Sequence, residues 1–284
     1  MRHAALNRHQ SITGKQVVML MEQLRAQAGI KIESPQPVIE GHIRNRMSAL
    51  GIDDFSAYMS VFDDSISARA EWLALIDLLT VKETRFFRQA EALEGLAGYI
   101  ESLMDQSTVA PDFSFWSAGC SGGQELYSIA MVVESIFGQQ KPWSEWYGIG
   151  TDISFQAITE AQRGRYSESD IQTIPVKYRH PFVSKVSADE WEISENIRAR
   201  ANFFHSNLLQ VNSTPFSDFD VIFCQNVLIY FEHETQIWII NQLVDRLKKG
   251  GLLVLGAGED VRWTNSKMQR AGWSGVCAYK KLEV

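Results

Sequence analysis

The chain has 284 residues, of which 45% are hydrophobic and 21% are charged, as is ordinary for a soluble globular protein. No apolar run approaches the ~20 residues needed to cross a bilayer. The N-terminus also lacks the apolar core of a signal peptide, so we expect a cytoplasmic protein without membrane insertion. The formal net charge of −7 argues against general nucleic-acid binding. Three separated cysteines without a CxxC pair argue against a disulfide framework or a metal site.

Residues 1–78 are predicted to form a small all-helical domain. Apolar residues recur there at helical spacing, as in Ile39, Ile43, Met47 and Leu50. Gly51 is expected to end this helix, and Asp53-Asp54 to cap the next one. A further apolar stripe covers 70–79, and nothing in the domain is typical of a strand.

Formal charge is distributed unevenly along this helical domain. Residues 1–50 carry seven Arg and Lys against three Glu, whereas residues 51–80 carry one Arg against six acidic residues. A basic face on an acidic protein indicates a specific acidic partner. Charge alone nevertheless favours the simpler interpretation, which is a solvated helix face.

From Phe113 onward, the pattern changes to alternating strands and helices. Strands are expected at 113–118, 146–153, 218–231, 252–259 and 276–282, with helices at 125–137, 154–163 and 233–248. This order predicts an α/β fold with a mostly parallel sheet and helices on both faces, within a domain that covers 79–284. Residues 166–204 interrupt the alternation with scattered turn residues, and we expect a small β-rich insertion there.

Two predicted strand ends carry groups suited to a nucleotide-like ligand, which in such sheets binds beyond the carboxyl ends of the strands. The first strand is followed by SAGCSGGQE, whose glycines allow close approach to a ligand but equally suit a packing turn. The second strand ends in Asp152, which can accept hydrogen bonds from a ribose diol or cap the following helix. An NAD-linked oxidoreductase is a competing interpretation, but the compact glycine fingerprint that it requires is missing.

Four separated segments make the assignment more specific. They are TVKETRFFR (80–88), SAGCSGGQELYS (117–128), DVIFCQNVLIYF (220–231) and KKGGLLVLGAGE (248–259). In order, spacing and residue identity the chain resembles the chemotaxis receptor methyltransferases, the CheR family, over nearly its whole length. The resemblance implies a Rossmann-like S-adenosylmethionine-dependent methyltransferase domain with a small antiparallel β-subdomain inserted at 166–204. It also implies that the preceding helical domain recognises the receptor.

The resemblance also implies which residues form the site. By position, cofactor contacts are expected for Thr84, Arg88, Glu125, Asp152, Asn207, Leu208, Gln225 and Asn226, and catalytic roles for Arg88 and Tyr230. The chain departs from the usual family residues at several positions, with Lys82 for Asn, Gln124 for an acid, Gln225 for Arg, and Gly256-Ala257-Gly258-Glu259 for G-x-S-E. No metal ligand is implied.

The implied reaction transfers a methyl group from S-adenosylmethionine to a receptor glutamate. A glutamate with pKa ~4.3 is already ionised near neutral pH, so alignment rather than a general base is required. Arg88 could hold a carboxylate, either the cofactor's or the substrate's, by two parallel hydrogen bonds. Tyr230 could orient the sulfonium. The alternatives are a surface salt bridge for Arg88 and ordinary packing for Tyr230.

The implied partner is the cytoplasmic helical region of a methyl-accepting chemotaxis receptor, contacted by a basic face that includes Arg44 and Arg46. We expect the enzyme to be a monomer. A second hypothesis is a non-catalytic, cofactor-binding docking protein of the receptor array, motivated by Gln124 and Gln225. A small-molecule methyltransferase is a third, but it leaves the helical domain and the β insertion without a role.

Overall fold

The computed structural model describes residues 12–106, 112–138, 145–260 and 262–283. The chain divides into two compact units, Met1–Val81 and Lys82–Val284. The division follows helix α4 (Ser65–Leu79), the last helix of the first unit. It therefore falls three residues later than the expected boundary after residue 78.

The first unit is helical throughout its described residues. Its elements are α1 (Gly14–Ala28), α2 (Gln36–Ala49), α3 (Phe55–Met59), the 3-10 turn η1 (Ser60–Asp63) and α4. Asp54 caps α3 by accepting a hydrogen bond from the Ala57 N–H, as the sequence indicates. The expected apolar stripe of α2 is buried at Ile39, Ile43 and Met47 but not at Leu50. Leu50 is the C-cap residue of α2, so it lies beyond the last full helical position, and it is 43% exposed.

A hydrogen-bonded ion pair lies inside this helical unit. Glu71 on α4 is only 2% exposed, and its two carboxylate oxygens accept bonds of 3.0 and 2.6 Å from Nε and Nη2 of Arg46 on α2. The hydroxyl of Tyr58 donates to the same carboxylate at 2.5 Å. Burial and this bond to Glu71 raise the pKa of Tyr58 well above its ordinary value, so the hydroxyl remains a donor. Arg46 therefore joins α2 to α4.

The expected basic face stays a prediction, but Arg46 and Arg44 differ in their contacts. Arg46 pairs with Glu71, a carboxylate 25 residues away in the chain, and its side chain is 26% exposed. Arg44, two residues earlier, is 46% exposed and pairs only with Glu40 on the same helix at 3.2 Å. Arg44 is thus the more exposed of the two arginines.

Replacing Arg46 by Ala should destabilise the helical unit by about 2–3 kcal/mol, because Glu71 would be left buried without its cation. Arg44→Ala is the matched control. It should lower the free energy of unfolding by less than about 0.5 kcal/mol, because surface i,i+4 ion pairs contribute little to stability. Native-state hydrogen exchange of peptides that cover α2 and α4 measures both changes. Equal protection in the two variants would contradict a stabilising role for the internal pair.

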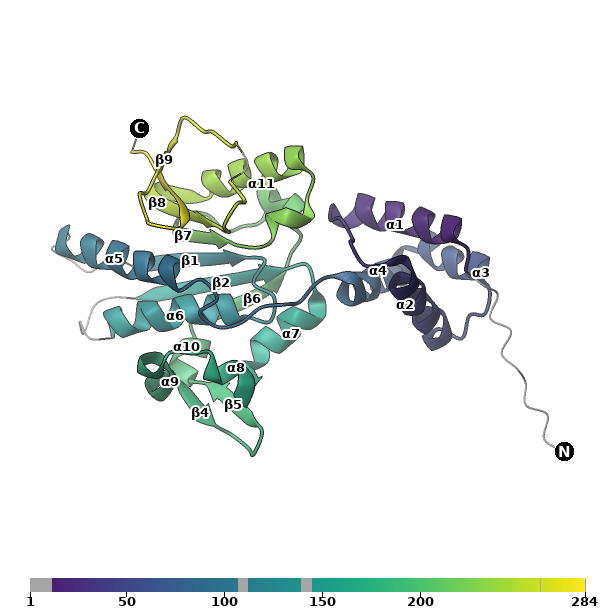
Figure 1. Cartoon of the computed structure of the whole chain (residues 1–284), viewed down its shortest axis with the longest axis horizontal. Helices are drawn as coiled ribbons and strands as arrows, with labels where there is room; N and C mark the ends of the chain where they lie inside the picture. The colour runs from purple at the N-terminus through teal and green to yellow at the C-terminus, as the bar shows by residue number, and fades with distance from the viewer. Residues whose placement is uncertain (1–11, 107–111, 139–144, 261, 284) are drawn as a thin grey trace. The chain divides into compact units, whose positions relative to one another are not determined.

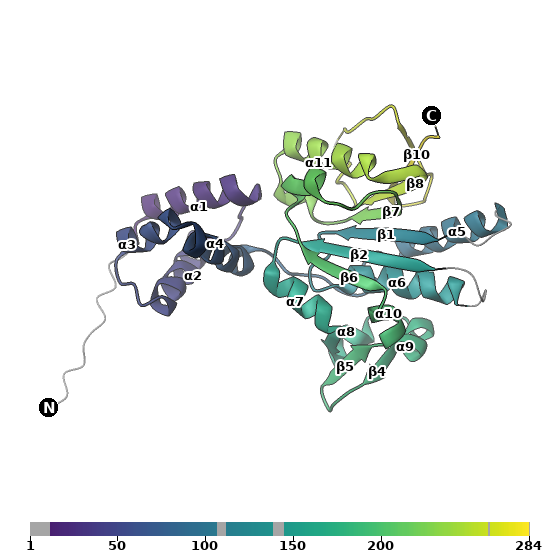
Figure 2. The same cartoon turned by 180° about the vertical axis from the view of Figure 1, so that it is seen from behind.

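The second unit is centred on a seven-stranded sheet with the order β6-β2-β1-β7-β8-β10-β9 (Figures 1 and 2). The strands are β1 (Phe113–Ala118), β2 (Trp146–Asp152), β6 (Ala201–His205), β7 (Phe219–Cys224), β8 (Leu247–Leu255), β9 (Met268–Arg270) and β10 (Cys277–Lys281). Strands β6, β2, β1, β7 and β8 are parallel. Strand β10 pairs antiparallel with β8, and β9 pairs antiparallel with β10. The predicted mostly parallel, Rossmann-like sheet is confirmed.

Helices pack on this sheet as the chain order requires. They are α5 (Ala90–Gln106), α6 (Gln124–Phe137), α7 (Phe155–Arg163) and α11 (His233–Asp245). The chain steps from β1 to β2 and β6 in one direction and from β7 to β8 in the other. Because such crossovers are right-handed, α6 and α7 cover one face and α11 the opposite face. Buried aromatic residues such as Phe113, Phe115 and Phe223 belong to the core cluster that also contains buried residues of α5, α6 and α7.

A separate three-stranded antiparallel sheet, with the order β3-β5-β4, is inserted between α7 and β6. Its elements are β3 (Arg165–Ser167), α8 (Glu168–Gln172), α9 (Val176–Phe182), β4 (Val183–Lys185), β5 (Glu190–Ile193) and the following α10 (Glu195–Arg198). The predicted range of 166–204 was too long. Residues 201–204 belong to β6, which pairs with β2 in the main sheet.

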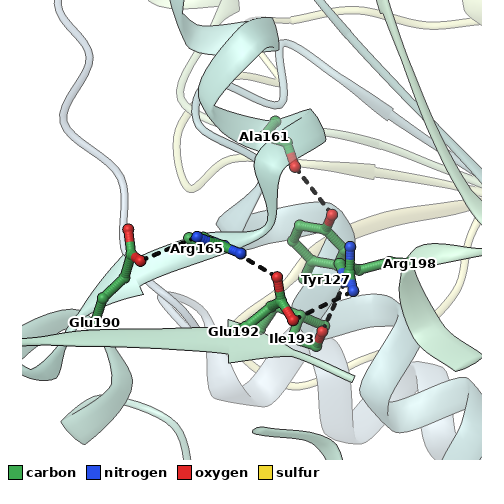
Figure 3. A network of polar contacts seen from close by, with 7 residues as sticks. All are labelled: Tyr127, Ala161, Arg165, Glu190, Glu192, Ile193 and Arg198. Carbon is green, nitrogen blue, oxygen red and sulfur yellow. Dashed lines mark hydrogen bonds and ion pairs between the residues drawn. The ribbon is translucent and has the colours of Figure 1, made fainter. Parts of the chain in front are cut away.

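Polar contacts join the strands of the small sheet to one another and to α10 (Figure 3). Arg165 pairs with Glu190 at 3.3 Å and with Glu192 at 3.0 Å, and Arg198 pairs with Glu192 at 3.3 Å. Nε of Arg198 also donates to the Ile193 carbonyl. Most of these groups are substantially exposed, so they set geometry more than they add stability.

Three further findings limit the chemistry of the described residues. No helix among them is long and apolar enough to cross a membrane. They contain no group of three or more His, Cys, Asp or Glu side chains arranged to hold a metal ion. Cys120, Cys224 and Cys277 are buried free thiols, and burial raises the pKa of each.

Candidate functional site

Strands β1 and β7 are neighbours in the main sheet. The strands that follow β1 in the chain are added on one side of it, as β2 and β6, and the strands from β7 onward are added on the other side. The direction of strand succession therefore reverses between β1 and β7. In open α/β sheets, ligands bind in the crevice beyond the carboxyl ends of the strands at such a reversal. The segments that follow β1, β2, β6, β7 and β8 all meet at that edge, because these strands are parallel. All of the predicted site residues except Thr84 and Arg88 lie in these segments or at the start of α6.

The loop after β1 is folded tightly against its neighbours. Gly119 has a φ of 91°, and a Cβ there would lie 2.3 Å from Cγ2 of Val227 in the loop after β7. The N–H groups of Gly119 and Cys120 both donate to the carbonyl of Thr151 at the end of β2, at 2.8 and 2.9 Å. Glycine is therefore required at 119 for packing, and this close approach brings the two central strand ends together.

Asp152 connects the end of β2 to the loop after β1. Its carboxylate accepts hydrogen bonds from the N–H of Ser121 at 2.9 Å and from the N–H of Ser154 at 2.8 Å. The N-cap of α7 is Ser154, which accepts from the Ala157 N–H, so the alternative that Asp152 caps this helix is wrong. These two bonds hold the Asp152 carboxylate between the end of β2 and the loop after β1.

Asn207 and Leu208 follow the end of β6. The Ser206 N–H donates to the Asp152 carbonyl at 2.9 Å, which holds this segment beside the end of β2. Asn207 caps the 3-10 turn η2 (Leu208–Ser213) by accepting a hydrogen bond from the Leu209 N–H, and Leu208 is buried. The structure thus brings Asp152, Asn207 and Leu208 to one side of the crevice.

Glu125 lies in the first turn of α6, and its carboxyl accepts a 2.7 Å hydrogen bond from the Ser117 hydroxyl on β1. Burial raises the pKa of Glu125 to about 7, against the opposing effect of the Ser117 bond. The charge of Glu259 raises it further and the charge of Arg88 lowers it. Arg88 and Glu259 therefore each lie within electrostatic reach of Glu125.

The segment that carries Arg88 is anchored by the two aromatic residues before it. Phe86 is buried edge-on against Tyr166 of the small sheet, with ring centroids 4.8 Å apart, and Phe87 stacks on Tyr178 at 4.9 Å. The Phe87 N–H donates to the Ser128 hydroxyl on α6, and this residue has a positive φ of 52°. These contacts hold a backbone conformation that is uncommon for a bulky residue.

Arg88 itself is exposed, and its Nη1 donates to the Glu83 carbonyl at 3.1 Å. Its charge lowers the pKa of Glu125. Thr84 lies in the same segment, before Arg88, and is partly exposed. The contacts of the segment place its backbone, and the cofactor and catalytic roles of Thr84 and Arg88 stay predictions.

Gln225 and Asn226 follow β7 directly. The buried Gln225 amide donates to Gln89 at 2.7 Å and to the Leu255 carbonyl at 3.3 Å, so it joins the Arg88 segment to the ends of β7 and β8. Asn226 has a positive φ of 60°, and its N–H donates to Glu259 at 2.8 Å. Tyr230 ends the 3-10 turn η3 (Leu228–Tyr230) in the same loop and is partly buried.

Glu259 is a site residue that our sequence reasoning missed. The segment GAGE was noted for its departure from the family pattern, but its acid was given no role. A signal was present, because an acid ends the predicted strand 252–259, and parallel strands bring their carboxyl ends to one edge of the sheet.

A cavity of about 550 Å³ lies elsewhere, between the glycine loop and the small sheet. It is lined by Gly122, Gln124 and Arg165 together with acidic residues of α7, α8 and β5. None of the predicted cofactor residues lines it, so it is separate from the crevice at the strand ends.

The raised pKa of Glu125 predicts a pH-dependent stability. Its ordinary value is 4.5, so the stability contributed by the protonated form is fully present below pH 4.5 and is lost as the pH rises through about 7. Glu125→Gln keeps an acceptor for Ser117 and should be more stable than the wild type at pH 8. The difference should be about 2 kcal/mol, which allows for partial exposure of the carboxyl.

Urea unfolding of the protein without cofactor at pH 4.5 and pH 8 measures this difference. Glu91→Gln, which neutralises an exposed carboxyl on α5, is the control, and its pH profile should be parallel to that of the wild type. Parallel pH profiles for Glu125→Gln and the wild type would contradict the burial of an ionisable Glu125.

Comparison with known proteins agrees with this geometry. Residues 82–275 match the family described as CheR methyltransferase, SAM binding domain. The chain is 32% identical over 237 residues to the chemotaxis protein methyltransferase of Klebsiella aerogenes, with 82% of this chain and 79% of that protein covered. It is 28% identical over 257 residues to the one of Borreliella burgdorferi, covering 89% and 90%. The corresponding Escherichia coli protein is 29% identical over 237 residues, covering 82% and 80%.

The family match extends over more than half of the chain and coincides with the unit that carries the crevice. The chain therefore belongs to the CheR methyltransferase family, and residues 82–275 form its S-adenosylmethionine-binding domain.

Proposed function

We propose that this protein transfers the methyl group of S-adenosylmethionine to glutamate side-chain carboxylates of a chemotaxis receptor, giving glutamate methyl esters. The observation that carries the proposal is the position of Asp152 and Glu125 at the strand reversal of a methyltransferase domain, each hydrogen-bonded to β1 or to the loop after it. Its relatives are named chemotaxis protein methyltransferases, which supports a receptor as the substrate.

The residues at the strand ends fit the chemistry of the cofactor. Asp152 at the end of β2 would accept hydrogen bonds from the ribose hydroxyls, and Asn207 and the buried Leu208 would frame the adenine. Glu125 offers a carboxyl to the positively charged end of the cofactor, while Thr84, Gln225 and Asn226 complete the lining. S-adenosylmethionine supplies an activated methyl group on a sulfonium.

The protein must align two reactants, which are the methyl donor and the substrate carboxylate. The substrate glutamate is ionised near neutral pH, so no proton has to be removed before transfer. Arg88 would orient a carboxylate by charge-assisted hydrogen bonds, and the Tyr230 ring would form one wall beside the sulfonium. An anion and a cation give neutral products, so the residues must hold both charges without stabilising either one strongly.

The non-catalytic docking hypothesis receives no support from a particular contact. One of its motives was the replacement of the family's Arg by Gln225, and Gln225 makes two hydrogen bonds that join the site segments. A radiolabelled-methyl assay on receptor membranes, paired with calorimetric titration of the cofactor, distinguishes the two. Cofactor binding without any methyl incorporation would favour the docking protein.

Arg88→Ala should abolish methyl incorporation while the fold remains intact, because the carboxylate would lose its cationic partner. Arg85→Ala is a matched control, since Arg85 is an exposed arginine in the same segment. Circular dichroism and the methyl-incorporation assay should be run on both variants. Undiminished activity in Arg88→Ala would remove Arg88 from the mechanism.

The helical unit supplies the proposed contact with the receptor, through a basic face that includes Arg44. Since Arg46 is held by Glu71 inside the bundle, the face should depend on Arg44 and not on Arg46. The expected attraction is between this face and acidic receptor helices, and such interactions weaken as salt rises.

Arg44→Glu should lower receptor methylation and reduce its sensitivity to salt, while the affinity for S-adenosylhomocysteine stays unchanged. Lys267→Glu is the control: it reverses one charge at a residue that is 64% exposed in the methyltransferase unit. Initial rates at 50 and 300 mM salt measure the effect, because the electrostatic screening length differs about two- to threefold between these salt concentrations. Equal rates for Arg44→Glu and the control would argue against a basic docking face at Arg44.

A further inference from the structure

Glu259 is a buried carboxylate that accepts hydrogen bonds from three backbone N–H groups. It is 2% exposed. Oε2 accepts from the N–H of Asn226 and the N–H of Gly256, both at 2.8 Å, and Oε1 accepts from the N–H of Ile229 at 3.3 Å. Burial raises the pKa of Glu259, whereas these backbone bonds lower it, because they favour the charged form.

The three donors come from two loops that leave neighbouring strands. Cys224 at the end of β7 pairs with Leu255 at the end of β8, and the loops separate immediately afterwards. Asn226 and Ile229 lie in the first loop and Gly256 in the second, so one carboxylate joins both. Hydrogen bonds to an ionised acceptor are stronger than neutral ones, and buried N–H groups without a partner are costly.

The backbone around Glu259 is shaped to receive this carboxylate. A Cβ on Gly256 would lie 2.2 Å from Oε2 of Glu259 and 2.8 Å from the backbone N of Asn226, so only glycine leaves room. The Glu259 N–H donates back to the Gly256 carbonyl at 3.1 Å, which closes a tight turn. Asn226 is held with a positive φ of 60°, a conformation that is uncommon outside glycine and needs such support.

What Glu259 holds is the loop proposed to form the wall beside the reacting methyl group. The loop begins with Asn226, continues through Ile229, whose side chain is 52% exposed, and ends at Tyr230. The same carboxylate acts electrostatically on Glu125 from the other side of the crevice. A shift of this loop by a fraction of an ångström would therefore change the alignment of methyl donor and acceptor without unfolding the sheet.

We propose that Glu259 is a positioning residue for methyl transfer, which fixes the Asn226–Tyr230 loop against the end of β8 through its three backbone hydrogen bonds. The proposal rests on the proposed function for its catalytic consequence. Its structural part, the fixing of the loop, stands independently of that function.

Glu259→Gln tests the proposal most sharply, because the amide oxygen can keep the two bonds made by Oε2. Its amide nitrogen would then face the Ile229 N–H, and donor would meet donor. We expect the kcat for receptor methylation to fall on the order of tenfold to a hundredfold, as for other small misplacements. The affinity for S-adenosylhomocysteine and the melting temperature should stay close to those of the wild type. Glu259→Asp, whose shorter carboxylate can still accept from part of the loop, should recover some of the lost kcat.

Amide hydrogen exchange gives a readout that does not depend on turnover. In Glu259→Gln, the Ile229 amide should exchange faster while the Asn226 amide stays protected. Glu234→Gln, which neutralises an exposed carboxylate in the first turn of α11, is the matched control and should change neither exchange nor kcat.

Two results would overturn the proposal. Wild-type exchange at Ile229 together with wild-type kcat in Glu259→Gln would show that the loop does not need this carboxylate. A parallel loss of melting temperature, cofactor affinity and kcat would show a role in general stability instead of positioning. If the wild type itself forms no methyl ester, the proposed function fails, and the exchange of Ile229 still decides whether Glu259 fixes the loop.

Discussion

The candidate site depends on carboxylates that accept backbone N–H groups where the parallel strands end. Asp152 binds the loop after β1 to the start of α7, and Glu259 binds the loop after β7 to the loop after β8. Strand ends are where the sheet stops supplying hydrogen-bond partners, so each loop must find its own. Two acids meet that need at the edge of the sheet where we propose that the positively charged cofactor binds. In this proposal, the same groups serve the fold and the chemistry.

The inserted subdomain with the small antiparallel sheet packs against two segments of the candidate site. Tyr166 on β3 packs on Phe86 and donates its hydroxyl to the Gly122 carbonyl at 2.6 Å, and Tyr178 on α9 stacks on Phe87. The insertion therefore contacts both the Arg88 segment and the glycine loop. Gln225 reaches the Arg88 segment from the opposite side through Gln89. Arg88 is exposed, yet the backbone that carries it is held on both sides, which limits the entropy lost when it binds a carboxylate.

Much of this architecture could be predicted from the sequence, because strands and helices of the main sheet carry strong local patterns. Strand 113–118 was predicted to the residue, and the parallel order follows from the alternation of strands and helices. Strand β6 was missed because an edge strand with the exposed residue Phe204 has no clear alternation, and its place is set by pairing with β2. The internal pair of Arg46 and the contacts of Glu259 were not predicted for a related reason: their partners lie 25 and 33 residues away, and no local pattern shows such contacts.

The central claim is that the edge of the sheet at β1 and β7 binds S-adenosylmethionine and its demethylated product. Isothermal titration of the full chain with S-adenosylhomocysteine tests it most directly, with Asp152→Ala as the comparison. The account predicts saturable binding of one molecule per chain to the wild type and a much weaker interaction with Asp152→Ala. Absence of binding to the wild type, or equal affinity of the two proteins, would contradict it.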